Sequence, residues 1–315
     1  MKWKLTIYPA IFLVVTILVL FIVSLGVPGD FPSGSLYTIE KGTGLNNLAL
    51  DLFNNKIIKS PFLFKSFSVL LGGTKGIIAG DYVLNSRESS FSLANRMVSG
   101  DYQLALTKIT IPEGLSVKEI SVLLSKKFSN IKQEAFEKLA LNQEGYLFPD
   151  TYLFLPNTGA ETVIEKMKEV FKIKILTLDS NIKKFNKPLS DIIKMASIVE
   201  EEGRTTETRQ VIAGILWRRL SLGMPLQVDA SFKYINGKTT FDLTLNDLKI
   251  DSPYNSYLYK GLPPTPICNP GLDSIRATIT PIKTDYLYFL NDKDGKMHYA
   301  KTYAEHLQNK ELYLK

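Results

Sequence analysis

Ser190-Asp-Ile-Ile-Lys-Met-Ala-Ser-Ile-Val-Glu-Glu-Glu202 predicts a helix around which the rest of the chain is organised. Ser190 follows Pro188 and is a typical N-cap residue, so the helix is expected to begin there. At about 100° per residue, the apolar side chains fall on one broad arc. They are Ile192, Ile193, Met195, Ala196 and Val199, with Ile198 on the opposite side. The pattern is typical of a helix that packs one face into a core.

Glu200 lies within the apolar arc and not among the polar side chains of this helix. A carboxyl group held against apolar side chains has a destabilised charged form, so its pKa is expected to rise towards that of a working general acid. The alternative is a glutamate near a helix end that bends out to water, because acidic side chains are rarely buried. The segment alone leaves both interpretations open.

Composition and charge narrow the classes of function. The chain has 315 residues and a single cysteine, Cys268, so no internal disulfide can form. His298 and His306 are too few for a usual zinc site, and no cofactor is predicted. The net charge of +7 suits an anionic membrane surface or an anionic wall polymer. No nucleic-acid-binding motif is found, so nucleic acid is not a predicted partner.

The N-terminal segment predicts a membrane anchor. Residues 5–27 contain no charged residue, and Lys2 and Lys4 precede them. This length crosses a bilayer as a helix, and the positive-inside rule places the N-terminus in the cytoplasm. A cleaved signal peptide is the alternative, but the run is long and lacks a small-x-small cleavage site. We therefore expect a cytoplasmic tip and single-pass anchor in the cell membrane at 1–28, a linker at 29–35, and an extracytoplasmic remainder.

Two later segments have similar sequences. Residues 37–52 and 109–124 match at one constant offset, with Gly42 opposite Gly114, and each predicts a strand, a glycine turn and an amphipathic helix. Duplication and a common motif used twice both explain the match. Residues 36–108 form a predicted small α+β module. It contains no nucleophile–base pair, metal cluster or phosphate loop, so we expect it to bind and not to catalyse.

Several motifs, in this order, resemble the endolytic murein transglycosylases, the MltG/YceG-like family. The match covers most of the chain outside the predicted anchor and is strongest from Gly145 to His306. The motifs are Gly145-Tyr-Leu-Phe-Pro-Asp-Thr-Tyr152, Ala196-Ser-Ile-Val-Glu200, Arg219-Leu with Gly223-Met, Leu226-Gln-Val-Asp229, Ser252-Pro-Tyr-Asn255 with Tyr257, Gly261-Leu-Pro-Pro264, Asn269-Pro-Gly271, Tyr286-Leu-Tyr-Phe289 and Glu305-His306.

The sequence departs from the family's pattern at three places. The family commonly has Asn-Arg-Leu where this chain has Arg218-Arg219-Leu220, and Asp-Pro where it has Asp229-Ala230. The family's Glu-Lys-Glu-Thr is Glu200-Glu201-Glu202-Gly203 here. None of these departures removes the Glu200 carboxyl group, but Arg218 and Ala230 are expected to alter contacts along a binding groove.

The resemblance implies an α+β fold class: an N-terminal transmembrane helix, a small LysM-like module at 36–108 and a mixed α/β catalytic domain at 109–315. It implies a lyase that acts on peptidoglycan glycan strands, with Glu200 as the catalytic residue. It also implies that the enzyme works near peptidoglycan synthases and terminates nascent strands, with residues 5–27 in the cytoplasmic membrane.

The predicted mechanism uses one carboxyl group. Glu200 would protonate the glycosidic oxygen between N-acetylmuramic acid (MurNAc) and N-acetylglucosamine (GlcNAc). It would then act as base while the MurNAc C6 hydroxyl attacks C1 and closes a 1,6-anhydro ring. An intramolecular nucleophile has a high effective molarity, so no enzyme nucleophile is needed.

Six further residues are candidates for supporting roles. Gln227, Asp229 and Asn255 would form hydrogen bonds to sugar or to Glu200, and Glu202 would tune Glu200 by repulsion. Tyr254 and Tyr257 would stack on sugar rings. For each of them, a structural role is the alternative.

Two other functions remain open. A conventional muramidase would use Asp229 or Asp150 as a second carboxylate, because ordinary glycosidases use two flanking acids. A non-catalytic wall-binding adaptor would use the same groove without cleaving the strand.

Overall fold

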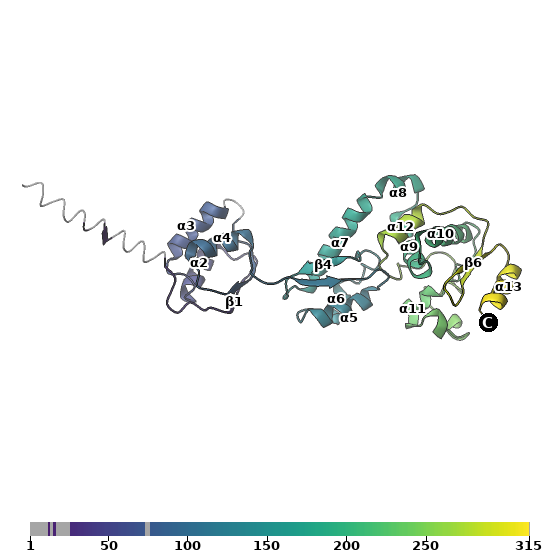
Figure 1. Ribbon diagram of the computed structural model, residues 1–315, viewed down its shortest axis with the longest axis horizontal. Helices are drawn as coiled ribbons and strands as arrows, with labels where there is room; N and C mark the ends of the chain where they lie inside the picture. The colour runs from purple at the N-terminus through teal and green to yellow at the C-terminus, as the bar shows by residue number, and fades with distance from the viewer. Residues whose placement is uncertain (1–11, 13–14, 17–25, 73–75, 315) are drawn as a thin grey trace, which may run out of the picture. The chain divides into compact units, whose positions relative to one another are not determined.

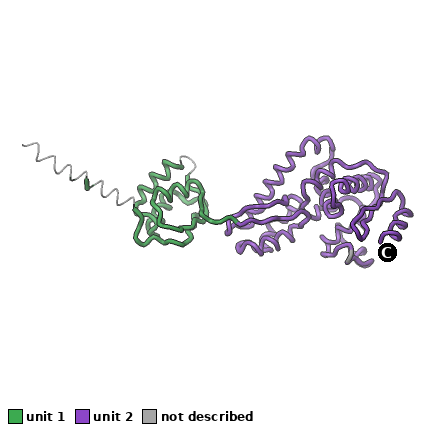
Figure 2. The backbone as a smooth tube through the Cα atoms, in the orientation of Figure 1, with its two compact units in different colours: residues 1–106 green, residues 107–315 purple. Residues whose placement is uncertain are grey.

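The computed structural model describes the chain except for residues 1–11, 13–14, 17–25, 73–75 and 315. It divides into two compact units, unit 1 at residues 1–106 and unit 2 at residues 107–315 (Figure 2). The predicted assignment of 36–108 as a LysM-like module and 109–315 as a catalytic domain stays a prediction. Each unit is described separately below.

Unit 1 packs helices against a two-stranded antiparallel sheet, in which Tyr37 of β1 lies opposite Tyr82 of β2 (Figure 1). Ser60 caps the helix that begins at Pro61, because its hydroxyl oxygen accepts the Leu63 N–H at 3.3 Å. The core contains Leu48, Leu52, Phe64, Tyr82, Leu93 and Met97, which are all buried. The elements are β1 (Ser35–Ile39), α2 (Leu45–Asn54), α3 (Pro61–Gly72), β2 (Gly80–Leu84) and α4 (Ser90–Ser99).

Unit 2 is mainly helical, with two short antiparallel strand pairs, β3–β4 and β5–β6. Its first half contains β3 (Thr107–Thr110), α5 (Val117–Lys127), α6 (Gln133–Leu139), β4 (Thr151–Phe154), α7 (Ala160–Leu176) and α8 (Asp179–Phe185). Its second half contains α9 (Leu189–Glu202), α10 (Thr206–Ser221), α11 (Ala230–Asn236), the 3-10 turns Thr240–Asp242 and Asp247–Lys249, α12 (Leu272–Ile279), β5 (Tyr288–Asn291), β6 (Met297–Ala300) and α13 (Tyr303–Tyr313).

Helix α9 is the central helix of unit 2 and packs against α10, α11 and α12. The predicted arc is confirmed, because Ile192, Ile193, Met195, Ala196 and Val199 are all buried. Two details of the prediction were wrong. Ile198 and Ser197 are buried too, because the chain at 267–268 covers the other face: the Ile267 N–H donates to the Ser197 hydroxyl at 3.1 Å. The helix begins at Leu189 after an N-cap at Pro188, whose carbonyl accepts the Ile192 N–H at 3.1 Å.

The predicted fold class needs correction in two parts. A membrane span requires about 20 consecutive apolar helical residues, and no helix among the described residues is long and apolar enough to cross a membrane. The predicted transmembrane helix is therefore not part of the observed fold, and most of residues 5–27 lie outside the described residues. The predicted mixed α/β catalytic domain is instead α+β, because its described strands pair only in antiparallel two-stranded sheets.

The two similar segments, 37–52 and 109–124, adopt the same local structure. Each forms a strand, a turn and a helix, β1 with α2 and β3 with α5. Gly42 and Gly114 both have the left-handed φ that the turn needs, at +87° and +79°. Ser116 and Glu119 form a capping box at the start of α5. The turn at Gly114 brings the preceding residue, Glu113, close to α12.

Candidate functional site

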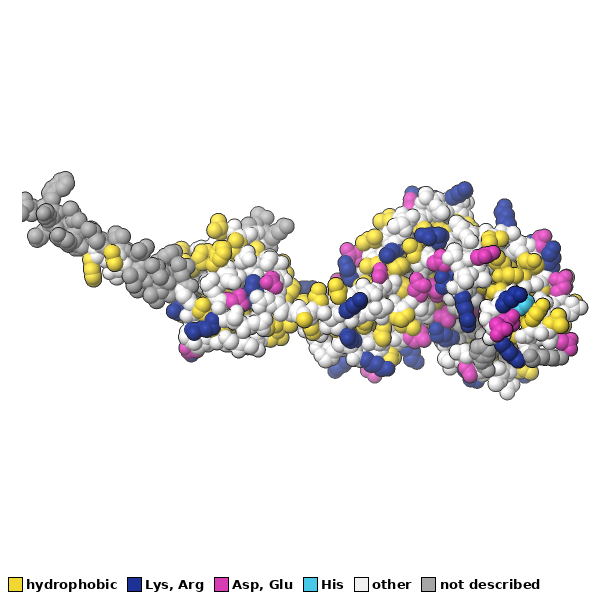
Figure 3. Space-filling model, in the orientation of Figure 1, with side chains coloured by type: hydrophobic (Ala, Val, Ile, Leu, Met, Phe, Trp, Pro, Cys, Tyr) yellow, Lys and Arg dark blue, Asp and Glu magenta, His cyan; other side chains and the backbone are white. Residues whose placement is uncertain are grey.

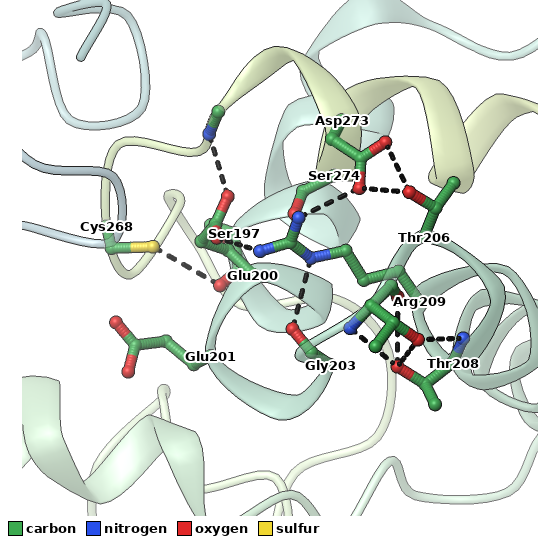
Figure 4. Close-up of polar contacts among 12 residues, drawn as sticks. Ser197, Glu200, Glu201, Gly203, Thr206, Thr208, Arg209, Cys268, Asp273 and Ser274 are labelled. Atoms are coloured by element: carbon green, nitrogen blue, oxygen red, sulfur yellow. Dashed lines mark hydrogen bonds and ion pairs between the residues drawn. The ribbon is translucent and has the colours of Figure 1, made fainter. Parts of the chain in front are cut away.

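Glu200 lies in the last turn of α9 and points into unit 2, not to bulk water. Its side chain is 6% exposed. One carboxylate oxygen accepts a hydrogen bond from Arg209 Nη2 at 2.6 Å, and the other accepts the backbone N–H of Gly271 at 2.8 Å (Figure 4). The alternative in which Glu200 bends out to water is therefore wrong. The carboxyl group is held in one orientation by α10 on one side and by the N-terminus of α12 on the other.

Arg209 in α10 joins three elements through its guanidinium group. Besides binding Glu200, it donates from Nη1 to Asp273 at 2.8 Å and from Nε to the Gly203 carbonyl oxygen at 3.0 Å (Figure 4). The Thr206 hydroxyl also donates to Asp273, at 3.1 Å. Planar guanidinium groups suit this kind of shared contact with two carboxylates. Arg209 therefore fixes the ends of α9, α10 and α12 around Glu200.

The three consecutive glutamates at the end of α9 point in different directions. Glu201 accepts a hydrogen bond from Lys233 of α11 at 2.9 Å, and Glu202 accepts the Ala230 N–H at 3.4 Å. Burial, and then the nearby charge of Asp229, raise the pKa of Glu202 to about 7. Two residues along a helix are about 200° apart, so Glu202 faces α11 and not the surroundings of Glu200. The predicted tuning of Glu200 by Glu202 stays a prediction without a direct contact to support it.

Five of the predicted supporting residues belong to two segments that lie side by side, 226–229 and 254–257. The Gln227 N–H donates to the Ser256 carbonyl oxygen at 3.1 Å, and the Tyr257 hydroxyl donates to Asp229 at 2.6 Å. Burial, and next the charge of Asp229, raise the pKa of the Tyr257 hydroxyl. Among the described residues, no hydrogen bond connects these two segments to Glu200.

Asn255 and Tyr254 have their polar atoms engaged within unit 2. Asn255 is fully buried and donates from its amide to the carbonyl oxygens of Leu248 and Ile250, at 3.0 and 2.9 Å. Its position is that of a residue that holds a loop. The Tyr254 hydroxyl is 2.8 Å from the Thr265 hydroxyl, and its ring packs against Tyr234 with centroids 4.9 Å apart.

Gln227 has an unusual backbone conformation and a fixed side chain. Its φ of +51° is in the left-handed region, which is uncommon for a residue other than glycine. Its side-chain oxygen accepts a hydrogen bond at 2.5 Å from Arg219, which is 4% exposed. Arg219 also donates to the carbonyl oxygens of Pro225 and Leu287, at 2.9 and 3.2 Å. The amide nitrogen of Gln227, which is exposed, remains as a donor for a bound ligand.

Replacing Arg219 with lysine is expected to lower the free energy of unfolding of unit 2 by about 2–3 kcal/mol. One ammonium group cannot bind Gln227 and two carbonyl oxygens at once, and hydrogen bonds to a charged group contribute about 1.5–3 kcal/mol each. Urea unfolding followed by Trp217 fluorescence measures the change. Arg218→Lys is the control, because its side chain is 40% exposed and binds the exposed Asp285, so it should cost less than about 1 kcal/mol. If both variants lowered the free energy of unfolding equally, Arg219 would not have the special structural role described here.

Two small hollows lie on unit 2, and each is lined by one of the two rings of the Tyr234–Tyr254 contact. One is lined by Ser231, Tyr254, Ser256, Tyr259, Leu262 and Pro263, and the other by Ser116, Glu119, Glu201, Ala230, Lys233 and Tyr234. Each hollow has room for little more than one water molecule, so a sugar could only rest its apolar ring face on the aromatic side chains at the surface.

Glu113 is a second carboxyl group near Glu200 that the sequence interpretation missed. It lies between β3 and α5, and its carboxyl group packs against Gly271: a methyl group added to Gly271 would lie 1.9 Å from a Glu113 oxygen. Partial burial, and then the charge of Glu200, raise the pKa of Glu113 above its usual value of 4.5. Glu113 and Glu200 therefore approach the same glycine from two sides.

Asn269 ties the Glu113 loop to the segment that contains Gly271. Its carbonyl oxygen accepts the Gly114 N–H at 3.0 Å, and its side-chain oxygen accepts the Leu147 N–H at 2.9 Å. Its amide nitrogen donates to Leu115 O at 2.9 Å and to Glu144 at 3.1 Å. Glu144 is buried and also accepts the Val117 N–H at the start of α5. Burial raises the pKa of the Glu144 carboxyl to about 7.

The Glu144 carboxyl group is expected to make unit 2 less stable as the pH rises. Its pKa is about 7 in the folded chain and near 4.5 when unfolded, so the folded state holds the proton more tightly. The stability from this group is complete below pH 4.5 and is lost as the pH rises through 7, at about 1.4 kcal/mol per pKa unit. Urea unfolding at several pH values should show a steeper decline for the wild type than for Glu144→Gln. If the stability of the two proteins fell equally with pH, the Glu144 carboxyl group would not be the cause of the decline.

The similarity to known proteins extends over most of the chain. The model of the YceG-like family matches residues 37–312. An endolytic murein transglycosylase of Bacillus subtilis is 34% identical over 303 residues, which cover 88% of this chain and 84% of that protein. One of Streptococcus pneumoniae is 30% identical over 313 residues, which cover 86% of this chain but only 57% of the pneumococcal protein. A crystal structure of a YceG-like protein from Listeria monocytogenes superposes with a TM-score of 0.59 at 28% identity, covering 87% of this chain and 98% of that one.

Proposed function

This chain belongs to the YceG-like family, and we propose that it is a peptidoglycan lytic transglycosylase that cuts within glycan strands. The relatives in Bacillus subtilis and Streptococcus pneumoniae are endolytic murein transglycosylases. In the proposed reaction, the β-1,4 bond between MurNAc and GlcNAc breaks and the MurNAc residue ends as a 1,6-anhydro sugar. The observation that supports this most directly is the fixed, nearly buried carboxyl group of Glu200.

Glu200 is the catalytic residue in this proposal. Its two partners, Arg209 and the Gly271 N–H, are both donors, which is how a carboxylate is bound. As a carboxylate, Glu200 removes the proton from the MurNAc C6 hydroxyl while O6 attacks C1. The leaving glycosidic oxygen must gain a proton in the same step. Glu200 could supply that proton first, as the sequence interpretation supposed, only from a neutral form in which its hydrogen bonds to Arg209 and Gly271 are weaker.

Sugar recognition is assigned to the surface around the two hollows. Tyr254, which lines one of them, offers a ring face, and the exposed Gln227 offers an amide donor. On the face shown in Figure 3, acidic, basic and apolar side chains of unit 2 are interspersed. Recognition of neutral sugar rings by hydrogen bonds and stacking suits such a surface better than binding of a polyanion along a basic track.

The place of action and the partners follow from the substrate. Peptidoglycan lies outside the cytoplasmic membrane, so we place both units there, at the membrane's outer face. Unit 1 would act as a LysM-like module that binds the glycan strand, since it contains no catalytic constellation in its described residues. Peptidoglycan synthases, which produce the strands, would be neighbours whose products this enzyme terminates.

Mass spectrometry of the products from purified glycan strands tests the proposed reaction. A transglycosylase yields internal cuts with 1,6-anhydro-MurNAc ends, which are one water lighter than hydrolysis products. Products that have gained water would identify a muramidase. Binding of intact strands without any cleavage by the wild-type protein would identify a wall-binding adaptor. Either result would overturn the proposal.

A further inference from the structure

Glu200 is poorly placed to supply the proton that the leaving sugar needs. Both of its carboxylate oxygens are already acceptors, one for Arg209 and one for the Gly271 N–H. Arg209 is itself held by Asp273 and the Gly203 carbonyl oxygen. Protonating Glu200 would therefore require both hydrogen bonds to weaken, because a neutral carboxyl group is a poorer acceptor than a carboxylate, and it would leave the nearly buried guanidinium group beside a neutral partner. A proton donor that is separate from Glu200 removes this requirement.

Glu113 has the position and the environment of such a donor. Its carboxyl group touches Gly271, the residue whose N–H holds Glu200. The residue is exposed, so a bound strand can reach its carboxyl group. Among the described residues it has no hydrogen-bond or ion-pair partner, in contrast to Glu200, Glu201 and Glu202. Burial and the charge of Glu200 both favour its protonated form, which raises its pKa.

The loop that carries Glu113 is fixed on both sides. The Ile111 N–H donates to the Asp150 carbonyl oxygen at 3.0 Å, and the Gly114 N–H donates to the Asn269 carbonyl oxygen at 3.0 Å. Gly114 lies at φ +79° and its Cα is close to the side chains of Glu200 and Glu201. The position of Glu113 therefore depends on the same segment, 269–271, that orients Glu200.

We propose that Glu113 is the general acid of the reaction and Glu200 its base, a division of labour that rests on the transglycosylase activity proposed above. The Glu113 carboxyl group gives its proton to the glycosidic oxygen as the bond from MurNAc C1 to that oxygen breaks. The Glu200 carboxylate takes the proton of the C6 hydroxyl as the bond from O6 to C1 forms. No water is consumed. Transfer of one proton from Glu200 back to Glu113, past Gly271, restores the starting state.

A substrate with an activated leaving group separates the two roles. On natural glycan strands, Glu113→Gln and Glu200→Gln should each lower kcat by about 10²–10⁴-fold, the usual contribution of a general acid or base. On a glycan oligomer that ends in nitrophenyl MurNAc, the leaving group needs no proton. The loss in Glu113→Gln should then shrink to less than about tenfold, while the loss in Glu200→Gln persists. Equal losses on both substrates in Glu113→Gln would overturn the assignment, because a structural role would not respond to the leaving group.

Gly271→Ala tests the geometry without removing either carboxyl group. The new methyl group would displace the Glu113 carboxyl, which is the end of a flexible side chain, while the backbone N–H to Glu200 stays. Gly271 has φ −73°, which alanine accepts. Away from Glu200, Glu113 loses the influences that raise its pKa, so it should lose its proton at a lower pH. We therefore expect a lower kcat and an alkaline limb of the pH profile that begins at lower pH than in the wild type.

Gly159→Ala is the matched control for this variant. Gly159 is also the N-cap of a helix, with φ −88°, and a methyl group there would meet no atom within 4 Å. It should keep the wild-type rate and pH profile. An unchanged alkaline limb in both Gly271→Ala and Glu113→Gln would refute the role of Glu113. That result differs from failure of the proposed function itself, in which the wild-type protein would form no 1,6-anhydro ends.

Discussion

Glu200→Gln is expected to reduce strand cleavage by about 10²–10⁴-fold while the protein still binds glycan strands. The amide is nearly the same size as the carboxylate, but it cannot take the proton of the C6 hydroxyl, and a base in this position contributes about 10²–10⁴-fold. The fixed orientation of Glu200 adds to the effect, because Arg209 and the Gly271 N–H hold its carboxylate in a single orientation. The measurement is the rate of 1,6-anhydro product formation from purified strands, with binding measured separately by co-sedimentation.

Two further measurements make this result specific. Glu200→Asp keeps the charge but shortens the side chain, so it should retain some activity if Arg209 can still be reached. Trp217 fluorescence and urea unfolding should show that Glu200→Gln is folded, since the amide oxygen still accepts one hydrogen bond. Cleavage by Glu200→Gln at a rate near that of the wild type would show that the base is another residue.

Arg209→Met should produce the second large effect, on both stability and activity. It leaves the nearly buried Glu200 without its cationic partner and removes the link from α10 to Asp273 of α12. Breaking one partner of a buried ion pair costs about 3–5 kcal/mol, because a buried charge is left uncompensated. The free energy of unfolding of unit 2 should fall by that amount, and kcat should fall because the Glu200 carboxyl group is no longer oriented.

A double-mutant cycle shows whether this effect acts through Glu200. In a Glu200→Gln background, Arg209→Met should destabilise unit 2 less, because a neutral amide needs no cation. Asp273→Asn is the matched comparison, because Asp273 is the second carboxylate that binds the Arg209 guanidinium group. Its side chain is 30% exposed, so its loss of stability should be smaller than that of Arg209→Met. Additive effects of the Arg209 and Glu200 substitutions would mean that the ion pair contributes little.

The central helix of unit 2 could be predicted from the sequence because its signals are local. The apolar spacing of Ile192, Ile193, Met195, Ala196 and Val199 marks a buried face, and all five residues are buried. The burial of Ile198 and Ser197 could not be foreseen, because the segment that covers them, at 267–268, is distant in the sequence. The same periodicity identified Glu200 as a carboxyl group on the wrong face of a helix, which the structure explains through Arg209 and Gly271.

The partners of Glu200 could not be predicted because they come from distant parts of the chain. Asp273 is 64 residues from Arg209, and Gly271 is 71 residues from Glu200. Glu113 sits in an ordinary Pro-Glu-Gly turn whose sequence resembles any exposed loop. Asn255 shows how a loop residue can serve the fold: its predicted hydrogen bond to sugar stays a prediction, and its amide donates to the carbonyl oxygens of Leu248 and Ile250.

Asn269 also determines when the protein can become active during its own synthesis. It joins Leu115 across 154 residues and Leu147 across 122, and Gly271, two residues later, holds Glu200. A growing or prematurely ended chain that stops before this segment would contain Glu113 and Glu200 but nothing to bring them together. Because chains emerge from the ribosome N-terminus first, the surroundings of Glu200 can be completed only after residues 269–271 have been made.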